Sequence, residues 1–335
     1  MEIATLYISA QGAKLARIGE RLVARSKDGA VIHDVPFFKV RQVICFGSVE
    51  ISSAAINQLI QRNIDVVYLT LSGRFKCRLS NLNEKSVITR TMQYRRSFED
   101  SFRLQTGRAV VKGKLLNYRS WMNSRQRKGG IESAAELASI NEAINLVDSA
   151  ENADELMGLE GTGTRAYFEV FRRNLRQDLG FNERNRRPPR DPVNAMLSFG
   201  YTILLHKVLA AIETAGVDPF MANLHANQNG RPSLALDLME EFRLFVVDAV
   251  VARLVNLVQV KPGDFIVTAD QGVKMQPATI ALLVRELQAR LGACFPYARD
   301  GRKLQLQDQI LRQAYHYRDV VCGDCERYSP VFFPW

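Results

Sequence analysis

The sequence predicts an α+β protein, with an N-terminal β-sandwich domain at residues 1–86 followed by a larger all-α domain at residues 87–335. Two observations support this prediction. Apolar residues alternate with a period near two over residues 1–80, which is typical of half-buried strands, and from about Ser86 the period changes to that of helices. The length of 335 residues also suits about two domains.

The strands expected in the first domain are short and are separated by turn residues. One turn is expected at Gln11-Gly12 and another at Lys27-Asp28-Gly29, where Asp-Gly tolerates the positive φ of a tight hairpin. Residues 52–62 begin with two serines and carry apolar residues at helical spacing, so one helix is expected among the strands. The expected strands are residues 5–8, 14–18, 21–24, 30–32, 43–46, 64–69 and 75–78.

Apolar residues at i, i+3 and i+4 predict helices throughout the second domain. A long basic helix is expected from Phe98, and residues 131–153 suit one or two acidic helices. Asp191-Pro192 predicts a helix start, with Asp as the N-cap and Pro at the first helical position. Ser233, after Pro232, is expected to cap a later helix in the same way. Further helices are expected at residues 154–180, 191–215, 233–258 and 277–292.

The charge of the chain is unevenly distributed around a net value of +10. Residues 86–128 carry 11 Lys and Arg against 2 Asp and Glu, and residues 165–190 carry 8 against 3. Between them, residues 129–164 carry 8 Asp and Glu and no Lys or Arg. Aromatic residues lie among the cations of both basic segments, which favours binding to a polyanion such as nucleic acid. A basic surface exposed only to solvent is the alternative.

Composition and motifs argue against several other classes of protein. The apolar runs are interrupted by charge before they reach the length of a membrane span, and no secretory signal is visible. We therefore expect a soluble, cytoplasmic protein with no membrane partner. Five scattered cysteines do not form a disulfide framework, and Cys322 and Cys325 lack a second pair that would complete a zinc site. No nucleotide-binding motif is present, so ATP-driven chemistry is not expected.

Asp237, Glu240 and Glu241 place three carboxylates at i, i+3 and i+4 in a protein that is basic overall. Like charges at this spacing repel one another unless a cation lies among them. A divalent metal held against a phosphodiester would supply that cation, and His225, shortly before the helix, offers a nitrogen ligand. The alternative is an ordinary helix surface whose charge Arg243 partly neutralises.

Glu160 lies in a segment that contains three glycines. The glycines could indicate a phosphate-binding loop, but no Lys-Ser/Thr follows them and the segment contains a carboxylate. We expect instead that Gly158, Gly161 and Gly163 let another helix approach closely and present Glu160 to it.

These motifs together resemble those of the CRISPR adaptation integrases, a family of metal-dependent DNA endonucleases that insert new spacers into a CRISPR array. The resemblance covers nearly the whole chain. The motifs that carry it are Thr5-Leu6-Tyr7, residues 47–52 and 65–75, Glu160-Gly161 with Arg165 and Tyr167-Phe168, residues 187–201, Leu224-His225, and Ser233 with residues 237–243.

The resemblance implies a helical catalytic domain in which Glu160, His225 and Glu240 hold Mg²⁺ or Mn²⁺, with Asp237 as an accessory acid. It also implies a homodimer formed largely through the β domain. Two such dimers would clamp a small ferredoxin-like partner dimer, giving a heterohexamer that binds double-stranded DNA. Two carboxylates and one imidazole suit Mg²⁺ or Mn²⁺ better than a sulfur-rich zinc site would.

The expected reaction is transesterification, in which the 3′-hydroxyl of a DNA fragment attacks a phosphodiester of the array. Two other functions stay open: a structure-selective DNA or RNA nuclease that uses water, and a non-catalytic DNA-binding scaffold. The role of His225, as a metal ligand alone or also as a general acid, is open as well. The arginines expected to contact the DNA backbone are Arg95, Arg96, Arg165, Arg184, Arg186 and Arg187.

Overall fold

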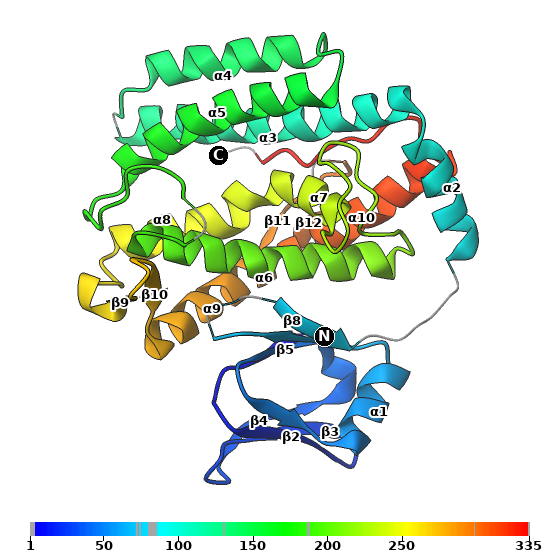
Figure 1. Ribbon diagram of the computed structural model, residues 1–335, viewed down its shortest axis with the longest axis vertical. Coiled ribbons are helices and arrows are strands. Elements are labelled where there is room, and N and C mark those ends of the chain that lie inside the picture. Colours follow the sequence, from blue (N-terminus) through cyan, green and yellow to red (C-terminus); the bar gives the residue numbers. More distant parts are fainter. Residues whose placement is uncertain are drawn as a thin grey trace. The chain divides into compact units, whose positions relative to one another are not determined.

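The computed structural model describes residues 4–71, 73, 75–79, 86–129, 131–185, 188–297 and 299–333. The chain divides into two compact units, which are Met1–Glu84 with Pro277–Val284, and Lys85–Gln276 with Arg285–Trp335. Strands dominate the first unit and helices the second, as the blue and the cyan-to-red ribbons of Figure 1 show. The predicted α+β fold class is confirmed. The periodicity of the sequence gives no signal that residues 277–284 group with the strands.

Unit 1 contains two four-stranded sheets. In the first sheet, β1, β5 and β7 are parallel and β8 is antiparallel. In the second sheet, β2, β3 and β4 are antiparallel and β6 runs parallel to β2. The first sheet has the order β1 (Ala4–Ile8), β5 (Val40–Phe46), β7 (Asp65–Leu69), β8 (Phe75–Leu79). The second has the order β4 (Val31–Pro36), β3 (Arg21–Arg25), β2 (Ala13–Ile18), β6 (Val49–Ile51).

One apolar core joins the two sheets, because alternate side chains of each strand point inward. Leu15 and Leu22 of the second sheet share this core with Val43 and Val66 of the first. Helix α1 (Ser53–Gln61), the helix expected among the strands, connects β6 to β7 and contributes Leu59 to the core. Its N-cap Ser52 accepts a hydrogen bond from the backbone N–H of Ala55.

Both predicted turns of unit 1 are present. Asp28-Gly29 closes the β3–β4 hairpin, with Gly29 at φ 89°, a conformation that favours glycine. At Gln11-Gly12 the chain passes from one sheet to the other, and the Gln11 side chain bonds to Phe46 O and Ser48 N.

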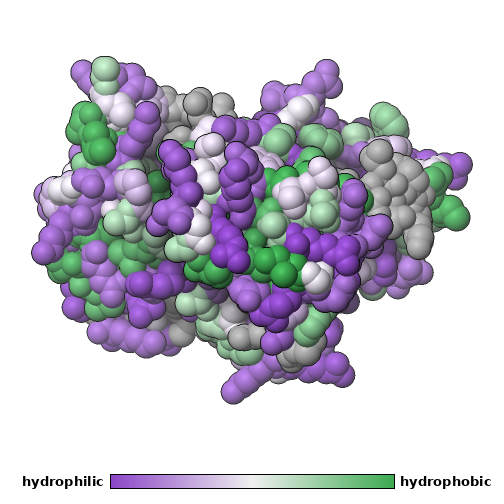
Figure 2. All heavy atoms as spheres, turned by 90° about the horizontal axis from the view of Figure 1, so that it is seen from below, coloured by the Kyte–Doolittle hydropathy of each residue, from purple (hydrophilic) through white to green (hydrophobic). Residues whose placement is uncertain are grey.

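The surface of unit 1 carries exposed apolar side chains. Val31, Phe38 and Phe75 are each 54% exposed. In Figure 2, apolar residues in green are interspersed with hydrophilic residues in purple over the visible face of the molecule. Single exposed apolar residues are ordinary on a folded protein, whereas a cluster of them suggests an interaction surface.

Unit 2 is built from two groups of helices. Helices α3, α4 and α5 pack against one another, α6 packs against α7 and α10, and α3 also packs against α7. Figure 1 shows α3, α4 and α5 running side by side within the unit. The helices of the second unit are α2 (Val87–Ser97), α3 (Asp100–Gly129), α4 (Ala134–Val147), α5 (Ala153–Asn174), α6 (Pro192–Thr214), α7 (Ser233–Arg243), α8 (Ala249–Asn256) and α10 (Leu306–Cys322), with α9 (Pro277–Gly292) divided between the units.

Short elements complete the chain, and the sequence analysis did not predict them. Leu244–Asp248 forms a π-helical turn, η2, that joins α7 to α8 without a break. Such turns are rare and often lie at functional sites. Two hairpins and two 3-10 turns make up the rest: β9 (Phe265–Val267) with β10 (Val273–Met275), β11 (Cys294–Pro296) with β12 (Lys303–Gln305), η1 (Phe37–Lys39) and η3 (Pro262–Asp264).

One of the two predicted helix starts is confirmed and the other is wrong. Asp191 caps α6 as expected, since its carboxylate accepts a hydrogen bond of 2.8 Å from Asn194 N–H. The prediction that Ser233 caps α7 is wrong: its hydroxyl donates to the carbonyl of Ala226 at 2.8 Å, so it holds the preceding loop instead. The backbone N–H of Leu234 donates to Pro219 O at 2.9 Å, which satisfies part of that helix end.

Helix α6 is long and apolar enough to cross a membrane by length and composition, with a mean hydropathy of 1.6. This differs from the expectation that charge interrupts every apolar run before it reaches such a length. Of the most apolar stretch, 67% is buried inside the protein, as expected for a helix whose apolar side chains form a core.

Candidate active site

Glu160 and Glu240 come from different helices and meet at one cation. The ammonium of Lys114, on α3, forms ion pairs with Glu160 of α5 and with Glu240 of α7. Its Nζ lies 2.7 Å from Glu240 Oε2. Arg243 Nη2 lies 2.9 Å from the other oxygen, Glu240 Oε1. Only 3% of the Lys114 side chain is exposed, so these charges interact where water screens them little.

A glycine allows α5 to come close to α3. A Cβ on Gly163 would collide with the Leu115 side chain of α3. At Gly158 and Gly161 a Cβ would meet nothing within 4 Å, so close approach explains only one of the three glycines. Helix α5 continues unbroken through all three glycines and presents Glu160 toward α3.

Asp237 fixes the loop that carries His225. Its carboxylate accepts hydrogen bonds from the backbone N–H groups of Asn223, Leu224 and His225 at 2.8, 3.0 and 3.0 Å. The same carboxylate lies 2.7 Å from His225 Nδ1. Asp237 is fully buried, and both of its oxygens are engaged in these contacts. The imidazole is thereby oriented through Nδ1, which leaves Nε2 to face other groups.

The charges around Glu240 decide its protonation. Burial alone would raise the pKa of Glu240, but Arg243, Lys114 and, more weakly, His225 outweigh burial and lower the pKa to about 2. Burial alone would likewise lower the pKa of Lys114, but Glu240 and Glu160 outweigh it and raise the pKa above its usual value. The site therefore contains a charged carboxylate beside a charged ammonium. His225 Nδ1 contacts Asp237, which lies one helical turn before Glu240 on α7.

The three acids of α7 are not an ordinary helix surface, because all three are buried. Each has different partners. Glu241 accepts hydrogen bonds from the Tyr328 hydroxyl, the Val331 N–H and Gln313, and it ties the C-terminal segment to α7. Burial raises the pKa of Glu241 to about 7. Glu241 therefore belongs to the framework of unit 2.

Asp248, at the end of the π-helical turn, contacts the tyrosine that lies against Arg243. Its carboxylate accepts hydrogen bonds from the hydroxyls of Tyr201 (2.6 Å) and Tyr167 (3.0 Å). Burial raises the pKa of Asp248 to about 6. The Arg243 guanidinium lies 4.9 Å from the centre of the Tyr201 ring, which holds it in place through a cation–π contact.

The structure brings the carboxylates of Glu160 and Glu240 together at Lys114, and Asp237 holds His225 through Nδ1. Glu240 Oε2 is buried, and its contact among the described residues is the ion pair with Lys114. Within the described part of the chain, no three His, Cys, Asp or Glu side chains are close enough together to enclose a metal as they stand. The Lys114 ammonium takes the position between the two carboxylates.

The nominated arginines differ in exposure. Arg95 and Arg165 are exposed on α2 and α5, as contacts to a DNA backbone would require. Arg96 is half-buried and lies over the Phe102 ring. Arg184 is also half-buried, donates to Ser198 Oγ at 3.0 Å and lies over the Tyr201 ring, so its side chain is partly engaged within the protein. The remaining two, Arg186 and Arg187, lie outside the described residues.

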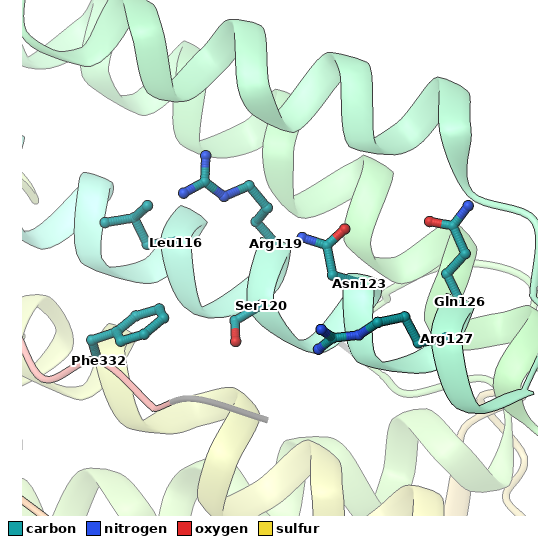
Figure 3. A pocket seen from close by; sticks show the side chains of 7 residues that line it. All are labelled: Leu116, Arg119, Ser120, Asn123, Gln126, Arg127 and Phe332. Carbon is teal, nitrogen blue, oxygen red and sulfur yellow. The ribbon is translucent and has the colours of Figure 1, made fainter.

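Two hollows border α3, and neither includes the acids. One, of about 390 Å³, is shown in Figure 3, where Arg119, Asn123 and Arg127 project from α3 and Phe332 faces Leu116. The other, of about 870 Å³, lies between α3 and the C-terminal segment and is lined by cations such as Arg108. Arg119 and Arg127 of the first hollow suit phosphate groups, whereas the second hollow also contains Glu99 and Asp148, which pair with Arg96 and Lys112.

Comparison with known proteins identifies the family. The family model for CRISPR associated protein Cas1 matches residues 6–289, and the chain belongs to this family. A curated relative from Rhodospirillum rubrum, named CRISPR-associated endonuclease Cas1 2, is 34% identical over 98% of both chains.

Solved structures share the fold. A casposase bound to an integration product superposes with a TM-score of 0.85 at 22% identity, over 98% of this chain and 93% of that one. A chain of a Cas6-RT-Cas1–Cas2 complex superposes with a TM-score of 0.82 at 21% identity, over 99% of this chain. The match covers only 36% of that longer chain.

Proposed function

We propose that this Cas1-family protein is a metal-dependent DNA endonuclease and integrase that inserts DNA fragments as spacers into a CRISPR array. The observation that carries the proposal is the meeting of Glu160 and Glu240 at one buried cation, with His225 held by Asp237 one helical turn before Glu240. The names of the curated relatives support nuclease activity, and the integration product in the casposase structure supports strand transfer on the same fold.

Glu160, Glu240 and His225 would hold Mg²⁺ or Mn²⁺, since two carboxylates and an imidazole suit these ions. The bound cation would supply Lewis-acid stabilisation of the charge that grows on the phosphate oxygens. Asp237 has both oxygens occupied, so we assign it the orientation of His225 through Nδ1 rather than direct coordination. Arg243, fixed against Tyr201, balances the charge of Glu240.

The proposed reaction exchanges one phosphodiester for another. The 3′-oxygen of the incoming fragment forms a bond to phosphorus, and the bond from phosphorus to the leaving strand breaks. The proton of the attacking hydroxyl passes to solvent and the leaving oxygen takes up a proton. This exchange needs no high-energy cofactor, which agrees with a sequence that has no nucleotide-binding motif.

A branched DNA that mimics the integrated intermediate tests this proposal. With Mn²⁺, the protein should rejoin the two array strands of the branch and release the fragment, because transesterification is reversible. Excess chelator should abolish this rejoining. Hydrolysis of the branch without rejoining would favour a nuclease that uses water, and activity unchanged by chelator would contradict the metal site.

We also propose that the chain acts as a homodimer with a small ferredoxin-like partner dimer, in a heterohexamer on double-stranded DNA. The exposed apolar residues Val31, Phe38 and Phe75 of unit 1 suit a protein contact. A solved complex that shares this fold pairs Cas1 with Cas2, which supports a partner of this kind.

Binding to duplex DNA is expected to be largely electrostatic. The logarithm of the association constant should fall linearly with the logarithm of salt concentration, and Arg165→Ala should reduce that slope by about one. Fluorescence anisotropy with labelled duplex, from low to physiological salt, measures both. An affinity that does not change with salt would contradict this prediction. Gln126→Ala, which removes a neutral side chain from α3, is the matched control and should leave the slope unchanged.

A further inference from the structure

The charges that meet at Lys114 and Arg243 balance one another without a metal. Two carboxylates, Glu160 and Glu240, face two cations, Lys114 and Arg243. A divalent cation added to this set would leave two uncompensated positive charges in a place where water screens them little. Either a buried cation moves away from the carboxylates, or the divalent ion binds weakly until DNA arrives.

Of the two cations, Lys114 is the one that stands between the carboxylates. Lys114 contacts both of them. Among the described residues, Arg243 forms an ion pair with Glu240 but not with Glu160. Lys114 thus contacts carboxylate oxygens of Glu160 and Glu240, the two residues proposed as metal ligands. Glu160 has one other hydrogen bond in the described structure, a neutral one of 2.9 Å from the Thr164 hydroxyl. Without Lys114, the Glu160 charge would have no cation in contact.

Lys114 is also the more easily displaced of the two. A lysine carries its charge at the end of a flexible four-carbon chain, whereas an arginine presents a planar group that stacks. The Arg243 guanidinium is fixed over Tyr201, and the Lys114 ammonium lies farther, 5.5 Å, from the Tyr118 ring centre.

From this arrangement we propose that Lys114 is a positioning residue that acts as an internal counter-cation. In the metal-free protein its ammonium holds Glu160 and Glu240 in position, and the divalent cation binds by displacing it. Lys114 thereby stabilises the empty site and lowers its affinity for metal. This inference rests on the proposed metal-dependent function.

Lys114→Met tests the inference because it removes the charge and keeps most of the apolar stem. In chelator, the melting temperature should fall by roughly 5–15 °C, since the half-buried Glu160 loses its contacting cation and the buried Glu240 loses one of two. Mn²⁺ should bind at least about tenfold more tightly than in the unaltered protein, measured by isothermal titration calorimetry. Lys112→Met, on the exposed side of α3, is the matched control and should change neither quantity.

A second variant separates charge from packing and keeps the test valid if Lys114→Met folds poorly. Lys114→Met with Glu160→Gln removes both members of the pair, and its melting temperature in chelator should return toward that of the unaltered protein. A double variant as unstable as Lys114→Met would overturn the inference, as would Mn²⁺ affinity in Lys114→Met that is unchanged or weaker. If the unaltered protein itself binds no Mn²⁺, the proposed function fails, and this inference fails with it.

Discussion

Replacing Glu160 by glutamine is expected to reduce strand transfer by at least about 100-fold. Loss of a residue that only orients a metal ligand costs about 10–100-fold, and Glu160 is proposed to bind the metal itself. The amide keeps the size of the side chain and can still accept a hydrogen bond from the Thr164 hydroxyl. It lacks the charge that the proposed cation requires. Lys114 keeps its ion pair with Glu240, so the fold should survive the change. Glu240→Gln is expected to have an effect of similar size.

The measurement is the rate of fragment integration with Mn²⁺, together with the affinity for the same DNA. Affinity should change little, since exposed cations contribute most of the binding to the DNA backbone. Glu142→Gln, on the exposed face of α4, is a control for loss of one carboxylate in unit 2. Integration by Glu160→Gln at the rate of this control would refute the catalytic assignment.

Asp237→Asn is expected to reduce strand transfer by about 10–100-fold and to lower the free energy of unfolding by about 1–3 kcal/mol. The carboxylate accepts three backbone N–H groups and orients His225 through Nδ1. An amide has one oxygen to accept these bonds, and its NH₂ group would face donors. The His225 loop would then lose part of its support, and the imidazole would lose its fixed orientation.

A double-mutant cycle with His225→Ala separates the two effects. If Asp237 acts on catalysis through His225, the double variant should integrate DNA no more slowly than His225→Ala alone. Urea unfolding should still show the loss of stability from Asp237→Asn, because the bonds to Asn223 and Leu224 do not involve the imidazole. Additive losses of activity would instead indicate a direct catalytic role for Asp237.

The sequence was sufficient to predict the fold class, because the change of apolar period from strands to helices is strong and occurs once. It was less informative wherever a polar side chain has two possible partners. Ser233 has the type and position of an N-cap residue, yet its hydroxyl bonds to Ala226 across the loop. Local spacing does not show that competing carbonyl. The π-helical turn after Arg243 likewise depends on packing that sequence propensity does not report.

Lys114 is a site residue that was not predicted from the sequence. It was counted among the cations of a basic segment, where a contact with DNA was the natural expectation. A signal was available, since Lys114 lies on the same helical stripe as the buried residues Val110, Val111 and Tyr118. A charge on the buried face of a helix requires a partner. Its partners, Glu160 and Glu240, are far away in the sequence and only the tertiary structure identifies them.

Both predictions above depend on joint binding of one divalent cation by Glu160, His225 and Glu240. Anomalous diffraction from crystals of the protein grown with Mn²⁺ would locate such a cation. The expected result is a single strong peak within bonding distance of both carboxylates and of His225 Nε2, with the Lys114 ammonium moved away from its place between the glutamates. Crystals that hold Mn²⁺ elsewhere, or none at this position at millimolar metal, would contradict the account.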